Sequence, residues 1–132
     1  MKTDKQIAAP GTVIAAPLIL LRAEGAFVFI LSILLYAHTG ASWWRFGALL
    51  LVPDVLMAGY WLGPRRGAAF YNFAHTYIGP VLLAGFAIVS SHLGLLPYSL
   101  IWTAHIAMDR ALAYGLKYPT GFKKTHLGWI GA

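Results

Sequence analysis

The sequence predicts an all-α fold: an integral membrane protein built as an antiparallel four-helix bundle. Three observations lead to this prediction, namely a strongly apolar composition, four apolar stretches of spanning length, and short linkers between them. Of the 132 residues, 59% are hydrophobic and 11% are charged, and the mean hydropathy is +0.68. Average soluble domains contain about 45–50% apolar and about 25% charged residues. A soluble domain of this length exposes too much surface to hide such a composition, so lipid is the expected solvent.

Four segments have the length that a membrane-spanning helix requires, which is about 20 mostly apolar residues. They are residues 17–37, 44–62, 68–90 and 96–117. Because lipid offers the backbone no hydrogen-bond partner, these segments are expected to be helical. Short linkers with Gly or Pro are typical of antiparallel neighbours. Pro53 and Pro80 fall inside the second and third spans, and each is expected to kink its helix.

The rest of the chain is expected to lie outside the bilayer. Residues 1–15 are polar and then rich in Ala, Pro and Gly, which indicates a cytoplasmic tail. Residues 118–132 are too polar to span and interleave basic with aromatic side chains, which favours a segment lying on the inner membrane surface. The whole chain, residues 1–132, is therefore expected to be a single membrane domain.

The basic residues predict the orientation. With four spans, one side of the membrane carries Lys2, Lys5, Arg65, Arg66, Lys117, Lys123 and Lys124, and the other carries only Arg45. Because cytoplasmic loops are enriched in Lys and Arg, both termini are expected in the cytoplasm, with the chain in the bacterial inner (plasma) membrane. The lipid bilayer is the first expected partner. The net charge of +6 thus reports topology, and nucleic acid is not expected to bind.

Ionisable and polar side chains fall inside these spans, where they are costly. Inserting one Asp, Lys or Arg at a helix centre costs roughly 2.5–3.5 kcal/mol, so these groups are expected to face the bundle interior. Most of the ionisable ones lie about two turns from the cytoplasmic end of their spans, with His105 one turn deeper, which places them in one slab. His126, in the C-terminal tail, either caps this slab or is exposed to solvent. The candidate site residues are Glu24, Asp54, Asn72, His75, His105, Asp109, Arg110 and His126.

Spacing along the helices brings some of these side chains together. His105 and Asp109 are four residues apart, and Asn72 and His75 are three apart, so each pair shares a helix face. His75, His105 and Asp109 are therefore expected at the centre of the site, with Asp54 opposite. Two imidazoles and two carboxylates would suit a divalent transition metal such as zinc, iron or manganese. The alternative is a hydrogen-bonded network that fixes helix register without chemistry.

The charges within the spans also bear on the choice between a metal site and a hydrogen-bonded network. Within the spans three carboxylates face two guanidinium groups, with Arg110 and Glu24 as the expected counter-charges. The uncompensated negative charge requires a protonated carboxyl, a protonated histidine or a bound cation. The sequence does not choose among these three.

Two further functions stay open at this stage. Carboxylate and histidine chains serve as proton relays in pumps, which suggests a small transporter or a proton-relay subunit. However, the polar residues do not continue through the outer half of the spans, which favours a site open to the cytoplasm. A pocket for an anionic lipid or a small anionic ligand is the other function. Its mouth would carry Arg22, Arg65, Arg66, Arg110 and Lys117, although Arg65 and Arg66 also fit as plain positive-inside anchors.

Several motifs together resemble a known family. They are "RAEG", "PDVLMAGY", "YNFAHTY", "AHIAMDRALAYGLKYPTGF" and "THLG". The chain resembles, from Leu21 to Gly128, a family of small bacterial membrane proteins described as a domain of unknown function. The resemblance implies a four-span membrane protein whose polar positions are the eight candidate residues above. A fainter likeness is to membrane-bound metal-dependent hydrolases, whose fuller set of metal ligands this chain lacks.

Overall fold

The computed structural model describes residues 15–116, 124–125 and 127–129, and this part of the chain is almost entirely helical. The elements are α1 (Ala15–His38), α2 (Trp43–Leu49), the 3-10 helix η1 (Val52–Leu62), α3 (Pro64–Ala74), α4 (Ile78–Val89), the 3-10 turn η2 (Leu93–Leu95) and α5 (Leu96–Ala111). The two-residue strands β1 (Lys124–Thr125) and β2 (Gly128–Trp129) pair antiparallel. The predicted helical character is confirmed.

The second and third expected spans are each interrupted near a proline. α2 ends at Leu49, and η1 begins three residues later, at Val52, with Pro53 in its first turn. α3 ends at Ala74 and α4 resumes at Ile78, with Pro80 in its first turn. Proline lacks the N–H that an α-helix needs and its ring clashes with the carbonyl four residues earlier. The kinks expected at the prolines are therefore full breaks.

α5 is shorter than the expected fourth span over residues 96–117. It contains 16 residues and ends at Ala111. At a rise of 1.5 Å per residue it is about 24 Å long, less than the hydrocarbon thickness of about 30 Å.

A Schellman motif ends α5 where hydropathy alone predicts that it continues. The backbone N–H of Tyr114 donates to the Asp109 carbonyl at 2.7 Å, and that of Ala113 donates to the Arg110 carbonyl at 3.1 Å. Ala113 adopts a φ of 65°, the left-handed conformation that this motif requires. The last turn of α5 is thereby fixed around Asp109.

Three helical segments in the described part of the chain are long and apolar enough to cross a membrane. They are Ala16–His38, Trp43–Leu62 and Pro64–Val89. Many of their large apolar side chains point outward, such as Phe27 at 74% and Val89 at 88% exposed. Soluble proteins rarely leave such contiguous apolar surface in water. The molecule therefore has the surface of a membrane protein.

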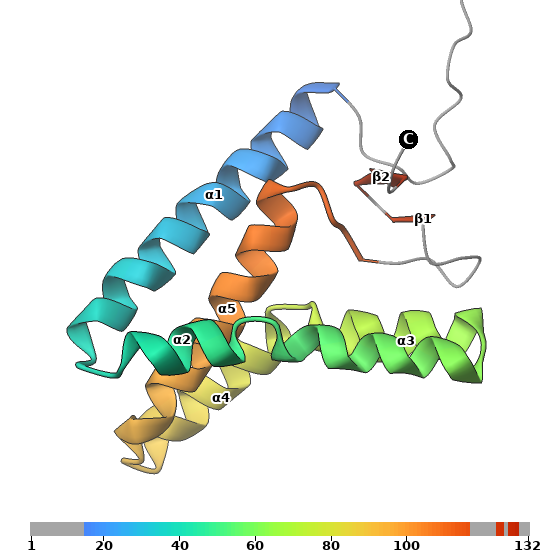
Figure 1. Ribbon diagram of the computed structural model, residues 1–132. Helices are drawn as coiled ribbons and strands as arrows, with labels where there is room; N and C mark the ends of the chain where they lie inside the picture. Colours follow the sequence, from blue (N-terminus) through green and yellow to red (C-terminus); the bar gives the residue numbers. More distant parts are fainter. Residues whose placement is uncertain (1–14, 117–123, 126, 130–132) are drawn as a thin grey trace, which may run out of the picture.

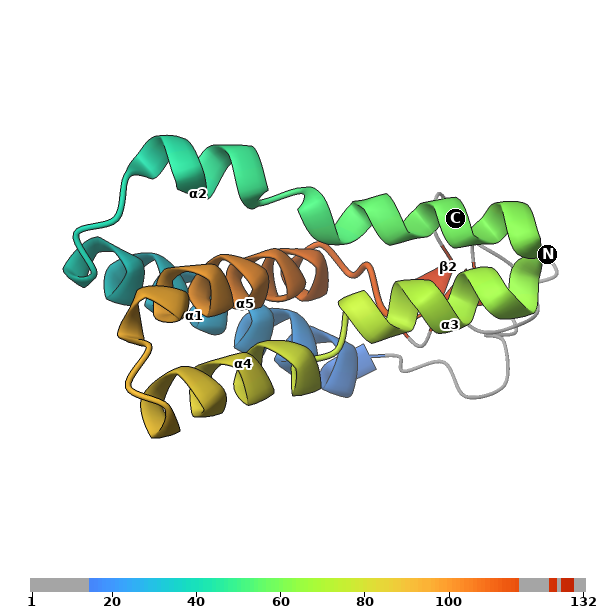
Figure 2. The same ribbon diagram turned by 90° about the horizontal axis from the view of Figure 1, so that it is seen from below.

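The helices are not arranged as four straight rods. α5 lies at the centre, packing along α1 on one side and against α4 on another (Figures 1 and 2). η1 and α3 pack mainly on each other as a helical hairpin, which turns at Gly63 with a φ of 107°. This hairpin projects well beyond the ends of α1 and α5 (Figure 2). The α1–α2 and α4–α5 loops both lie toward the opposite end of the molecule from the hairpin turn.

α5 is the most buried helix, and small residues let its neighbours approach it. Ala104 and Ala107 are fully buried along its length. On α1, a Cβ added at Gly25 would lie 2.7 Å from the Cβ of Arg110, so the two helices meet backbone to backbone there. On α4, a Cβ at Gly79 would overlap the Trp102 ring. These contacts fix the positions of the α5 side chains.

Candidate metal centre

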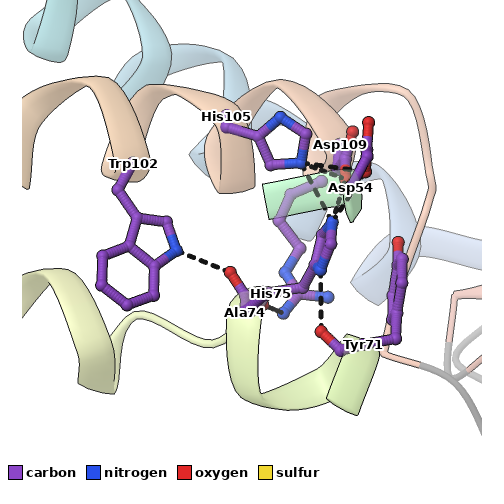
Figure 3. Close-up of polar contacts among 8 residues, drawn as sticks. Asp54, Tyr71, Ala74, His75, Trp102, His105 and Asp109 are labelled. Carbon is purple, nitrogen blue, oxygen red and sulfur yellow. Dashed lines mark hydrogen bonds and ion pairs between the residues drawn. The ribbon is translucent and has the colours of Figure 1, made fainter. Parts of the chain in front are cut away.

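Four side chains from three separate segments converge beside α5. Asp54 belongs to the first turn of η1, His75 is the C-cap of α3, and His105 and Asp109 lie one turn apart on α5. Both helix breaks contribute directly, because Asp54 follows Pro53 and His75 is the residue at which α3 stops. Figure 3 shows the side chains pointing toward one another.

The facing atoms are very close. The Nε2 atoms of His75 and His105 are 3.0 Å apart. Asp54 Oδ1 lies 3.1 Å from His75 Nε2 and 3.3 Å from His105 Nε2. Asp109 Oδ2 lies 3.3 Å from each of the same two nitrogens. One ligand atom from each of the four residues thus lies within 4.8 Å of the other three.

The two imidazoles are held in different ways. The Nδ1–H of His75 donates to the Tyr71 carbonyl at 2.7 Å, and the Tyr71 ring stacks on the imidazole at 3.7 Å between centroids. In neutral His75 this bond leaves Nε2 with its lone pair directed at the cluster. His105 is fully buried, and its Nδ1 has no hydrogen-bond partner among the described residues. A backbone carbonyl therefore orients His75 from behind, whereas His105 is oriented by packing and by the contacts of its Nε2 within the cluster.

The break between α3 and α4 is tied to α5 by two further hydrogen bonds. Arg110 Nη2 donates to the His75 carbonyl at 3.0 Å, and Trp102 Nε1 donates to the Ala74 carbonyl at 2.6 Å. Both carbonyls lie at the end of α3 and lack the helical partner they would have in an unbroken helix. Trp102 was not among the predicted site residues, since the sequence marks it only by its position one turn before His105.

Access to the cluster differs among its members. The side chain of Asp54 is 38% exposed, whereas those of His75 and Asp109 are 3% and 12% exposed. Asp54 also comes from a 3-10 helix, whose hydrogen-bond geometry is poorer than that of an α-helix. Entry to the cluster is therefore on the Asp54 side.

Glu24 lies apart from the cluster. It is exposed on α1 and lines a cavity of about 250 Å³ together with Tyr77 and Arg110. Within the described residues no carboxylate lies within ion-pairing distance of Arg110, whose guanidinium instead binds the His75 carbonyl. Of the two expected counter-charges, Arg110 thus contacts the cluster only through the His75 backbone, and Glu24 forms no hydrogen bond or ion pair with it in the described part of the chain.

The remaining two candidates have separate positions. Asn72 is half-buried on α3, and its backbone carbonyl accepts the N–H of His75 at 3.2 Å. It contributes to the end of the helix from which His75 projects. His126 lies outside the described residues.

The donor set suits a divalent cation. Two ionised carboxylates and two neutral imidazoles carry a charge of −2, which a divalent ion would neutralise within an otherwise apolar molecule. Imidazole nitrogen with carboxylate oxygen is a common ligand set for zinc and for other first-row transition metals. The geometry therefore fits a metal without rearrangement of the helices.

Comparison with known proteins gives a family but no activity. No curated protein and no solved structure matches the chain. One family model matches residues 18–130, which is most of the sequence and includes every residue of the cluster. The chain belongs to the family described as "Domain of unknown function (DUF4260)".

Proposed function

We propose that this chain is a metal-binding protein of the bacterial inner membrane, with zinc as the first candidate ion. It crosses the bilayer four times, with both termini in the cytoplasm, and α5 is the short, protein-enclosed crossing. The outward apolar side chains and the distribution of Lys and Arg support this topology. The cluster of Asp54, His75, His105 and Asp109 then opens toward the cytoplasmic half.

The spacing of the ligand atoms carries the proposal. Five pairs of facing atoms are 3.0 to 3.3 Å apart. A regular tetrahedron with metal–ligand bonds of about 2.0–2.1 Å has edges of about 3.3–3.4 Å. Without a cation, the same contacts require protons on the Nε2 atoms, each shared among the facing acceptors. The two Nε2 atoms at 3.0 Å converge with both carboxylates on one point, which is where a cation would bind.

The uneven burial supports a metal that does more than hold the helices together. His75, His105 and Asp109 are the enclosed ligands, and Asp54 is the exposed one. Structural zinc sites keep four fixed protein ligands, while catalytic sites keep three and leave the fourth position to water or substrate. We infer that Asp54 is the exchangeable ligand and that its departure opens that position to an oxygen ligand. This favours a metal-dependent reaction, as in a membrane-embedded hydrolase, over a structural role.

Elemental analysis of the detergent-purified chain tests the metal directly. Wild type should contain about one transition-metal ion per chain, because the cluster offers one set of four ligands. His105→Ala and Asp109→Ala should lose it, since each removes an enclosed ligand. Asp54→Asn should retain metal at lower affinity, because three ligands remain.

His92→Ala is the matched control. His92 is an exposed histidine in the α4–α5 loop, bonded to Ser90, and its loss should leave the metal content unchanged. A folded wild type without stoichiometric metal would overturn the proposal and favour the hydrogen-bonded network or a proton relay. Metal retained in both His105→Ala and Asp109→Ala would place it elsewhere.

A further inference from the structure

An apolar groove of about 420 Å³ lies beside the cluster, within the size range of ligand pockets. It is bounded by the α2–η1 break and η1, by the end of α3, by the middle of α4 at Leu83, and by the first half of α5. Its lining is aliphatic and aromatic and includes Val52, Pro53, Ala74, Leu83, Ile101 and Trp102. At its rim, Val55 and Phe73 are exposed on the outer apolar surface. The groove therefore opens toward the side that faces hydrocarbon in a membrane.

The groove and the cluster are built on the same segments. Pro53 of the groove directly precedes Asp54, and Ala74 directly precedes His75. On α5, Trp102 lies three residues before His105, and Figure 3 shows its indole N–H directed at the Ala74 carbonyl, on the side of the imidazoles away from the carboxylates. The indole N–H is already bonded to the Ala74 carbonyl at 2.6 Å, so Trp102 presents the groove with an apolar ring. An apolar pocket with a few polar groups at one end is typical of a ligand site.

We propose that this groove holds the hydrocarbon chain of a single-chain amphiphile whose carboxylate head reaches the metal at the Asp54 position. The proposal rests on the metal site proposed above. A carboxylate is the group that Asp54 itself supplies, so a ligand carboxylate can replace it with the same charge and donor atom. The chain would stay in an apolar environment as it moves from the bilayer into the groove. The substrate class is therefore a long-chain monocarboxylate.

Quenching of Trp102 fluorescence by a brominated long-chain fatty acid tests this. The chain is reconstituted in nanodiscs of unbrominated lipid with its metal bound, and the probe is titrated in. Bromine in the groove lies against the indole, so quenching should contain a saturable component. Trp102→Phe should remove that component and leave only the non-saturable quenching of the other tryptophans. A brominated alkane of similar length, which has no head, should give no saturable component.

Two neighbouring substitutions on α4 form a matched pair. Leu83 lines the groove, whereas Leu82 is 68% exposed outside it. Leu83→Phe fills part of the groove and should weaken probe binding about tenfold, in line with the cost of overpacking. Leu82→Phe should bind the probe like wild type. Both variants should keep the metal content of wild type, which shows that the cluster is intact.

The outcomes separate the two proposals. Metal present without saturable quenching overturns the amphiphile and leaves the metal site standing. Saturable quenching that persists in metal-free His105→Ala overturns the coordination of the head by the metal. Equal binding of the fatty acid and the alkane also overturns the role of the carboxylate. If wild type holds neither metal nor probe, the metal site itself fails.

Discussion

The Nε2 atoms of His75 and His105 face each other at 3.0 Å although the residues come from different helices, 30 positions apart in the chain. In His75, the bond from Nδ1–H to the Tyr71 carbonyl turns this face into an acceptor. This acceptor nitrogen, His105 Nε2 and two carboxylates crowd around one point, so a cation or protons must lie between them. The stability of the fold should therefore depend on what occupies this point.

Removing the metal should destabilise the protein. A ligand that binds only the folded state stabilises it by about 2.7 kcal/mol at a free concentration 100 times its dissociation constant. We expect a chelator to lower the midpoint of thermal unfolding in detergent, and added zinc to restore it. The same treatments should leave the midpoint of His105→Ala unchanged. If neither chelator nor zinc changes the unfolding midpoint of wild type, that result would count against a bound metal.

Arg110 should act as a positioning residue for His75. Arg110→Met leaves the buried His75 carbonyl without its partner, which costs about 1–3 kcal/mol of stability. It should also lower zinc affinity by about tenfold, as loss of an outer-shell partner does. Arg110→Lys should recover part of the affinity, because an ammonium can still donate to the carbonyl. Zinc titration monitors both variants.

Arg66→Met is the control for this prediction. Arg66 is exposed near the tip of the hairpin, and its substitution removes the same charge without touching the cluster. Its zinc affinity should equal that of wild type. If Arg66→Met and Arg110→Met weaken zinc equally, net charge rather than the His75 carbonyl is responsible.

Gly25 should be intolerant of any side chain. A Cβ there lies 2.7 Å from the Arg110 Cβ and from the Ala111 nitrogen, so Gly25→Ala forces α1 away from α5. We expect a loss of about 1–3 kcal/mol in unfolding free energy. Gly85→Ala is expected to raise the unfolding free energy instead, because Gly85 lies within α4 with nothing within 4 Å of its added Cβ. That substitution should stabilise the helix by about 0.8–1.0 kcal/mol, and equal effects of the two would contradict the close contact.

Ala113→Gly should stabilise the end of α5. Ala113 has a φ of 65°, a conformation that costs an L-residue roughly 1–2 kcal/mol and costs glycine little. Ala111→Gly, two residues earlier in the last helical turn, should instead destabilise by about 0.8–1.0 kcal/mol. Denaturant unfolding measures the change in unfolding free energy for each of the two variants. A destabilised Ala113→Gly would mean that the Schellman motif does not form.

Local sequence rules identified the cluster better than they identified the helices around it. The spacing of four between His105 and Asp109 is enough to align them on one face, and a depth count along each span brings His75 and Asp54 to the same level. The prolines locate both breaks. In these cases a property of one helix decides the outcome, so the sequence contains the information.

Depth alone could not decide the position of Glu24. It lies at the same level as the cluster, but direction around the helix depends on which face of α1 packs against α5. Gly25 supplies that contact, and the adjacent residue is turned about 100° away from it. The end of α5 was missed for a similar reason, because hydropathy does not register the left-handed conformation of Ala113. Contacts between helices, rather than composition, determine both features.

The projecting hairpin has a mechanical consequence. η1 and α3 pack mainly on each other, so the chain between Asp54 and His75 is a single arm that supplies both ligands from its base. The other two ligands belong to α5. A bound ion would link the base of this arm to α5. Because the arm is long, a small displacement at its tip would be transmitted to the two ligands at its base. A displacement of the Gly63 turn would therefore act on the one segment that supplies two of the four ligands.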